Sequence, residues 1–404
     1  MGVRDSVRSL ADLDALADLD ALVLAAVVWF LAKFLRYAFP PLFPAFRDAY
    51  GVENGELGIA FTAMMLVYAA MQFPSGALAD RFGRVPVVTV GALVAAAGAL
   101  ALVPASPFAV LVAAMVLVGA GTGVHKTVSV GLLSTVYPNR TGRALGVLDT
   151  FGAFGGVAAP AAVVFVGGAA GLAAGLDWHT VFLAAGLAGV VLAAAFAVRL
   201  SDRKTDDATG RGGVSLREYG ALFRKPRFAA FVLVTVGFSF AYNGVVAFLP
   251  LYLTDAAGLG DALAGALYSG LFVVSLVQPA TGELADRLTP LRVVAGTLSV
   301  ASVGLAGVLV GASPLLVGAS VLVFGLGSHG FRPVRGAYLL ELVPDELAGG
   351  GLGVVRTVLM GAGALAPAAV GLLTEYATYR AAFTLLLVAL VVAAAVALSL
   401  LATE

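Results

Sequence analysis

The sequence predicts an all-α membrane protein with twelve transmembrane helices in two six-helix bundles related by a pseudo-twofold repeat. Three observations lead to this fold class. Hydrophobic residues make up 60% of the 404 residues and charged residues only 12%, and the mean hydropathy is +1.00. In soluble domains, by contrast, about a quarter of the residues are charged. The apolar residues gather in twelve long runs, and the second half of the chain repeats the first. Lipid is therefore the expected solvent for much of the protein surface.

Each apolar run is long enough to cross the hydrocarbon core as a helix, which takes about 20 residues. Strands of a membrane barrel are about ten residues long and alternate in polarity, so the runs favour helices. In the first run, Pro40 and Pro41 are expected to break the helix just beyond Arg36, because proline cannot continue α-helical hydrogen bonding. The predicted spans lie near residues 22–46, 54–78, 85–104, 107–136, 143–167, 178–199, 226–253, 262–285, 290–311, 314–341, 347–373 and 380–402.

Polar segments divide the chain. The acidic repeat Ala11–Leu22 stands where a signal peptide would have its apolar core, so we expect a short cytoplasmic helix before the first span. The longest polar stretch is roughly Arg199–Arg227 and separates two sets of six spans. The predicted units are a cytoplasmic N-terminal segment (1–21), an N-terminal bundle (22–199), a cytoplasmic central loop (200–225) and a C-terminal bundle (226–404).

Basic residues predict the orientation. With the N-terminus in the cytoplasm, the basic residues outside the spans fall almost entirely on the cytoplasmic side, and only Arg47 and Arg380 lie on the exterior side. Positive loops stay in the cytoplasm. We therefore expect a multi-pass protein of the cytoplasmic membrane with both termini and the central loop in the cytoplasm.

The two halves of the sequence match at a nearly constant offset of 206 residues. The first span of each half ends near a matched proline, and a matched glutamine lies in the second. A repeat over an even number of helices relates the halves by parallel repetition, which is typical of a transporter with its site between two bundles. The matched pairs include Pro44 with Pro250, Gln72 with Gln278, Gly119 with Gly325 and Pro138 with Pro344.

The loop between the second and third spans carries the strongest motif, Gly76-Ala-Leu-Ala-Asp-Arg-Phe-Gly-Arg84. It resembles the G-x-L-A-D-R-x-G-R signature of the Major Facilitator Superfamily at each defined position, and the repeat extends the resemblance over essentially the whole chain. A second copy begins at Gly282 and has Thr289 where the signature has its second glycine. The resemblance implies a secondary transporter with spans 1, 4, 7 and 10 around a central cavity and spans 3, 6, 9 and 12 facing lipid.

The chemistry of this loop suits a gate. Its glycines permit a tight turn, its aspartate can bind a helix N-terminus, and its arginines can pair with acids or lipid phosphates. For a single arginine such as Arg84, an ordinary loop charge is the alternative interpretation. The residues predicted to form the gating loops are Gly76, Asp80, Arg81, Gly83, Arg84, Gly282, Asp286 and Arg287.

Seven charged residues lie well inside the predicted spans, away from the span ends, and Glu341 lies at the cytoplasmic edge of the tenth span. A charge at the centre of a bilayer costs roughly 2.5–3.5 kcal/mol, so such residues are expected to face protein or a water-filled cavity. Spans 3, 6, 9 and 12 have no charge in their interiors, which agrees with lipid-facing helices. The seven residues are Lys33, Arg36, Lys126, Asp149, Arg332, Arg335 and Arg356.

The excess of cations among these residues favours an anion site. Lys33 and Arg36 are three residues apart and share one helix face. Lys126 and Arg332 are repeat partners at matched depth in the two bundles. For Lys126, pairing with Asp149 on the next span is the alternative. The residues predicted to bind an anionic substrate are Lys33, Arg36, Lys126, Arg332 and Arg335.

Asp149 is the only carboxylate well inside a span, and Arg356 stands at the equivalent position of the second half. These two residues are the predicted coupling positions, with Asp149 as the carrier if transport is coupled to protons. Protonation would release its ion pair with Lys126 and so link proton binding to substrate binding. A structural pair that only neutralises Lys126 is the alternative.

The composition also limits other functions. The chain has no cysteine and three histidines, His125, His179 and His329, so no metal site and no cofactor are expected. No nucleophile–base pair in the spans suggests an enzyme. The preferred function is a secondary active transporter of a small organic or inorganic anion. Proton-coupled efflux of hydrophobic drug-like compounds and a non-transporting sensor with the same fold are the alternatives. We expect a monomer in membrane lipid, without nucleic-acid partners.

Overall fold

The computed structural model describes residues 3–138, 140–200, 222–343 and 348–403, and every regular element in these residues is helical. The first half of the chain forms α1 (Val3–Ala38), η1 (Pro40–Leu42), α2 (Phe43–Tyr50), α3 (Asn54–Phe82), α4 (Arg84–Leu100), α5 (Phe108–Gly123), α6 (His125–Val136), α7 (Thr141–Gly167), α8 (Ala169–Ala173) and α9 (Trp178–Leu200). The second half forms α11 (Pro226–Leu251), η2 (Tyr252–Ala256), α12 (Asp261–Val273), η3 (Val274–Val277), α13 (Gln278–Arg287), α14 (Pro290–Val310), α15 (Pro314–Leu342), α16 (Ala348–Tyr376) and α17 (Tyr379–Ala402).

Eleven helical segments of the described chain are long and apolar enough to cross a membrane. The remaining predicted span, 85–104, corresponds to α4, which is apolar but has only 17 residues. The prediction of an all-α membrane fold with about twelve spans is therefore confirmed. The predicted limits of the four units remain predictions, and residues 201–221 of the central loop lie outside the described residues.

The first span is broken where its prolines predict. Helix α1 ends at Ala38, and the 3-10 turn η1 begins with Pro40 and Pro41. Neither proline can donate a backbone hydrogen bond, so the α-helix is interrupted by a 3-10 turn before α2 begins. Gly51 then ends α2 with a φ of 62°, a left-handed conformation that glycine adopts without strain.

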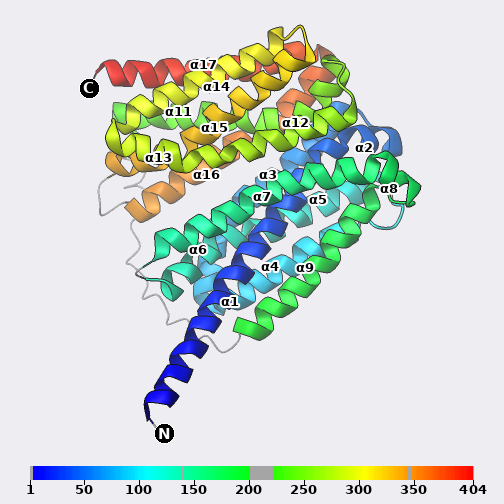
Figure 1. The fold of residues 1–404 in the computed structure, drawn as a ribbon. Helices are drawn as coiled ribbons and strands as arrows, with labels where there is room; N and C mark the ends of the chain where they lie inside the picture. Colours follow the sequence, from blue (N-terminus) through cyan, green and yellow to red (C-terminus); the bar gives the residue numbers. More distant parts are fainter. Residues whose placement is uncertain (1–2, 139, 201–221, 344–347, 404) are drawn as a thin grey trace.

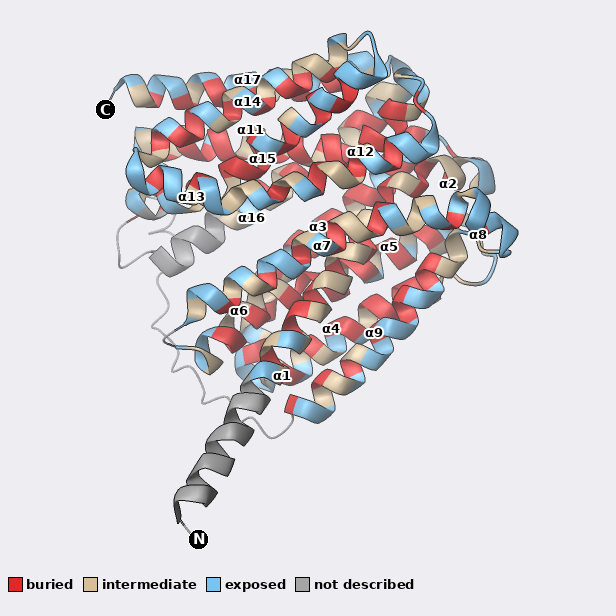
Figure 2. Cartoon of the chain, viewed as in Figure 1, coloured by how far each residue is buried: buried red, intermediate tan, exposed pale blue. Residues whose placement is uncertain are grey.

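Large apolar side chains cover the outer faces of the molecule. Val90 on α4, Val191 on α9, Val303 on α14 and Val388 on α17 are all more than half exposed. Figure 2 shows such exposed residues along the outer faces of α9 and α17. Soluble monomers rarely expose continuous apolar surface of this extent. The four helices whose interiors carry no charged residue, α4, α9, α14 and α17, therefore present a surface suited to lipid.

The two halves form separate helix bundles, which are stacked in Figure 1. They meet most extensively along α3 with α16 and α7 with α12, and η1 also contacts α11. The α3–α16 contact is backbone to backbone at one end. A Cβ added at Gly58 would lie 2.4 Å from the carbonyl oxygen of Pro367, and one added at Gly371 would lie 2.4 Å from that of Asn54. Only glycine allows these helices to pack so closely.

This contact is lost toward the other end of the molecule. Gly76 on α3 and Gly361 on α16 would meet nothing within 4 Å if a Cβ were added. The same change occurs along α7, where Gly156 packs against Phe272 but Gly146 meets nothing. The bundles therefore touch at the end that holds α2 and α8, the closed end, and separate toward the end that holds both termini, the open end (Figure 1).

Candidate functional site

A cavity of about 490 Å³ lies between the two bundles. Helices α1, α3, α6 and α7 line it on one side, and α11, α12, α15 and α16 on the other. All seven charged residues that the sequence places inside spans line this cavity, although they come from five helices. They are Lys33, Arg36, Lys126, Asp149, Arg332, Arg335 and Arg356.

Lys33 and its neighbours form the centre of the N-terminal side. The Nζ of Lys33 donates a hydrogen bond of 2.9 Å to the hydroxyl of Tyr37, one turn along α1. The same ammonium lies 4.5 Å from the centre of the Tyr37 ring and 5.7 Å from that of Trp29. Aromatic faces attract cations at these distances. Two rings and a hydroxyl therefore hold Lys33 in the cavity.

Arg36 is held in a similar way but is more deeply buried, with a relative exposure of 5%. Its Nε donates to the carbonyl oxygen of Ala32, and its guanidinium lies 3.9 Å from the centre of the Tyr68 ring on α3. Trp29 lies 5.5 Å from the same guanidinium. Stacking on an aromatic face is a preferred environment for arginine.

Lys126 forms an ion pair with Asp149 on α7. The side chain of Lys126 is 14% exposed and that of Asp149 is 61% exposed, so the carboxylate is the more accessible partner. The structure thus contains the local pairing that the sequence left as the alternative for Lys126. This lysine is neutralised in the described state and differs in that respect from its repeat partner, Arg332.

The C-terminal side carries three arginines. The guanidinium of Arg332 lies 4.6 Å from the centre of the Tyr242 ring on α11, and it is close enough to Tyr37 and Lys33 on α1 to interact with them electrostatically. Arg335, one turn further along α15, is close enough to Arg332 and Arg356 to interact with both electrostatically. Cations of the two bundles therefore face one another across the cavity.

Trp29 is a residue that the sequence interpretation missed. Three ammonium or guanidinium groups, those of Lys33, Arg36 and Lys126, lie between 5.5 and 5.7 Å from its ring. Gly152 on α7 packs directly against the indole of Trp29, and a Cβ added at this glycine would lie 2.3 Å from Nε1. The signal was present, because Trp29 precedes Lys33 by one helical turn.

The first loop predicted to act as a gate is a one-residue turn. Helix α3 ends at Phe82 and α4 begins at Arg84, with only Gly83 between them at a φ of 89°. Arg84 donates a hydrogen bond to Thr135 on α6. Asp80 is exposed and takes part in no ion pair found among the described residues.

The second gating loop differs because its glycine is replaced. Leu288 and Thr289 both lie between α13 and α14, so the turn is longer than in the first copy. Arg287 forms an ion pair with Glu283 inside α13, and Asp286 is exposed. The two copies, which the sequence motif makes nearly equivalent, therefore have different local structures.

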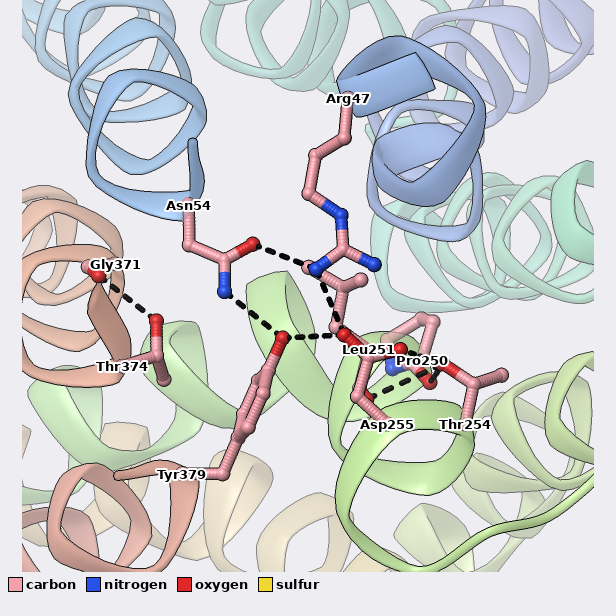
Figure 3. A network of polar contacts seen from close by, with 9 residues as sticks. All are labelled: Arg47, Asn54, Pro250, Leu251, Thr254, Asp255, Gly371, Thr374 and Tyr379. Carbon is pink, nitrogen blue, oxygen red and sulfur yellow. Dashed lines mark hydrogen bonds and ion pairs between the residues drawn. The ribbon is translucent and has the colours of Figure 1, made fainter. Parts of the chain in front are cut away.

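A polar network joins the bundles at the closed end (Figure 3). Arg47, after the break in the first span, forms an ion pair of 2.8 Å with Asp255 in η2. The hydroxyl of Tyr379 donates to the same carboxylate and accepts a hydrogen bond from Asn54, both at 2.8 Å. Nearby, the amide of Gly55 donates to the Glu375 carboxylate on α16. Nothing in the sequence predicts this network.

Comparisons with known proteins agree with the fold. The family model of the Major Facilitator Superfamily matches residues 25–328 and 267–404. A probable sulfoacetate transporter, SauU, of Cupriavidus necator is 28% identical over 309 residues, which cover 70% of this chain and 69% of that protein. A multidrug resistance protein, MdtH, of Klebsiella pneumoniae is 29% identical over 230 residues, which cover 54% of this chain and 52% of that protein.

Solved transporter structures share the fold at low sequence identity. A bacterial homologue of the human lysosomal transporter Spinster, inward-facing and unoccupied, has a TM-score of 0.79 and 16% identity, covering 95% of this chain and 97% of that chain. The nucleoside transporter NupG has a TM-score of 0.77 and 14% identity, covering 95% and 99%. The peptide transporter POT in complex with sulfate has a TM-score of 0.75 and 17% identity, covering 95% and 94%.

Proposed function

Because this chain belongs to the Major Facilitator Superfamily, whose members among its structural neighbours are transporters, we propose that its central cavity carries a small organic or inorganic anion across the membrane. The observation that carries this proposal is the charge of the cavity. Six cationic side chains line it against a single carboxylate. Asp149 is paired with Lys126, so the other five cations have no carboxylate partner among the described residues.

An anion would relieve the repulsion among these cations. Charges 4 Å apart interact with about 4 kcal/mol at the effective dielectric constant of a protein surface, far more than in bulk water. A bound anion between Lys33 and Arg332 would attract both bundles at once. It would therefore lower the free energy of the state in which the open end closes, which alternating access requires.

The similarity to a probable sulfoacetate transporter supports this choice, because sulfoacetate is a small organic anion. Efflux of drug-like compounds is the second candidate, and the similarity to a multidrug resistance protein favours it. The cavity argues against it for lipophilic cations, which the arginines of α15 and α16 would repel. On present observations the anion is the better supported substrate.

The distribution of basic residues supports a proposal for the orientation of the described state in the membrane. The positive-inside rule places both termini in the cytoplasm, so the open end would face the cytoplasm and the closed end the exterior. The network of Arg47, Asp255, Tyr379 and Asn54 would then seal the outer side. In this orientation the cavity is accessible to anions from the cytoplasm.

Flux through reconstituted vesicles tests the proposal. We expect proteoliposomes containing the protein to exchange labelled sulfoacetate or sulfate, and Arg332→Ala to weaken binding of the anion at least tenfold, about 1.4 kcal/mol. Arg332→Lys should retain part of the affinity, because it keeps the charge but loses bidentate recognition. Arg292→Gln, an exposed arginine at the start of α14, is the matched control and should behave like wild type.

Two results would contradict the anion proposal. One is anion binding that is unchanged in Arg332→Ala. The other is a cationic ligand that binds the wild type more tightly than any anion and gains affinity in Arg332→Ala. Vesicles that bind an anion but exchange none would instead favour the non-transporting sensor.

A further inference from the structure

Four of the six cations that line the cavity form two sets, and each set contains one residue from each bundle. In the first set, Lys33 of α1 and Arg332 of α15 are close enough to repel each other. Tyr37 lies between them, since it accepts the hydrogen bond of Lys33 and also interacts with Arg332. An anionic group placed here would meet a cation from each side and a tyrosine hydroxyl.

The second set repeats this arrangement. Arg36 of α1 stacks on Tyr68 at 3.9 Å, and Arg356 of α16 is close enough to the same tyrosine to interact with it electrostatically. All three side chains line the cavity. A second anionic group placed here would again meet one cation from each bundle and one tyrosine.

The two sets are adjacent, since Arg36 also interacts electrostatically with Tyr37 and Lys33 with Tyr68. Lys33 and Arg36 are three residues apart on α1, which puts their Cβ atoms about 5–6 Å apart. Arg335 on α15 is close enough to one cation of each set, Arg332 and Arg356, to interact with both electrostatically. A molecule with two charged groups separated by only a few bonds could therefore occupy both sets at once.

Building on the proposed anion transport, we propose that the substrate is a short organic dianion, with one anionic group between Lys33 and Arg332 and the other between Arg36 and Arg356. A monoanion would bridge the two cations of one set and leave the cations of the other set repelling each other across the cavity. That residual repulsion would oppose closure of the bundles around the substrate. A dianion would bridge the cations of both sets, so occupancy by two anionic groups favours the closed state.

Matched pairs of ligands test the number of charges. Sulfoacetate and ethanesulfonate differ by a carboxylate in place of a methyl group, and succinate and butyrate differ in the same way. Binding of each to the purified full-length protein is measured by titration calorimetry. We expect the dianion of each pair to bind at least tenfold more tightly than its monoanion.

Arg356→Gln locates the second charge. It should weaken binding of sulfoacetate at least tenfold and binding of ethanesulfonate less than threefold, because only the dianion uses the second set. Arg356→Lys should restore part of the sulfoacetate affinity, which a loss of folding would not allow. Arg292→Gln is the control and should leave all four affinities unchanged.

The outcomes separate this inference from the proposed function. Equal affinity for the two members of each pair, or equal weakening of both by Arg356→Gln, would overturn the dianion while leaving an anion transporter. Failure of all four anions to bind the wild type, with tight binding of a lipophilic cation, would overturn the anion transporter and the dianion together.

Discussion

At the scale of single residues, Trp29 has the densest set of interactions in the cavity. Its ring lies within 6 Å of three cations, and the ring itself is only 5% exposed. Each such contact contributes about 0.5–2 kcal/mol, depending on desolvation. The indole thus offsets part of the repulsion among three like charges and keeps them directed toward the cavity before a substrate arrives.

Trp29→Leu should therefore weaken anion binding without unfolding the protein. We expect KM for the transported anion to rise about tenfold while kcat changes less than twofold, because the cations remain but lose their common position. Trp29→Phe should recover part of the affinity, since a smaller ring still attracts cations. Transport kinetics in proteoliposomes measure both constants, and equal KM values for all three proteins would exclude a positioning role.

Asp149 has two roles open to it, and a double variant distinguishes them. If it carries the coupling proton, Asp149→Asn should abolish proton flux, and adding Lys126→Gln should not restore it. If it only neutralises Lys126, the single variant should impair transport and the double variant should recover transport with its proton coupling. Proton flux measured with a pH-sensitive dye alongside anion uptake gives the answer in both cases.

At the scale of elements, the sequence predicted the helices and the charged cavity residues well, because the bilayer requires long apolar helices and excludes charges from contact with lipid. Twelve apolar runs predicted the helices, and even the short α4 was found because its composition is apolar throughout. Pro40 and Pro41 predicted the break in the first span. The charged residues of the cavity were found because lipid does not tolerate them, and Asp149 was anticipated as a partner of Lys126.

Other parts of the site have no such signal. Tyr68 and Tyr242 line the cavity, but aromatic residues are ordinary in apolar helices and nothing in the sequence separates these two from the rest. Asp255 and Tyr379 belong to helix ends that are far apart in the chain. Polar residues are common at such ends, so only the packing of the two bundles reveals that they meet.

The first gating loop leads to a prediction about Asp80. This carboxylate is exposed at the end of α3 while the bundles are apart at the open end. A helix N-terminus attracts a carboxylate, and a partner from the other bundle would come within reach only after closure. Asp80→Asn should then leave the described state as stable as before and destabilise the closed one.

We expect Asp80→Asn to fold and insert normally, to bind the anion with unchanged affinity, and to transport at least tenfold more slowly. Thermal unfolding, equilibrium binding and uptake rates are the three measurements. Asp286→Asn in the second copy is the matched variant, and the longer turn there predicts a smaller effect. Weaker binding with an unchanged rate of transport would show that Asp80 is not a gate residue.

At the scale of the whole molecule, the closed end holds the two bundles together through few polar contacts. The Arg47–Asp255 pair is partly exposed, at 28% and 27%, and Tyr379 and Asn54 extend it into a network. Alternating access requires these contacts to break each time the cavity opens on this side. Their combined strength should therefore influence the relative populations of the described state and of the state in which the cavity opens at the other end.

Asp255→Asn should shift that balance toward opening of the closed end. The chain has no cysteine, so a single Thr62→Cys can report on it, because Thr62 is 7% exposed where its hydroxyl accepts a hydrogen bond from the Ala368 amide. Removing the ion pair should cost the described state about 1 kcal/mol, roughly a fivefold change in population. A maleimide that cannot cross the membrane, added on the exterior side in the proposed orientation, should label this cysteine about five times faster in Asp255→Asn.

Glu283→Gln is the control, because it breaks an ion pair inside α13 alone and should leave the labelling rate of the cysteine unchanged. Equal labelling rates in Asp255→Asn and Glu283→Gln would mean that backbone packing between α3 and α16 keeps this end closed without help from the network.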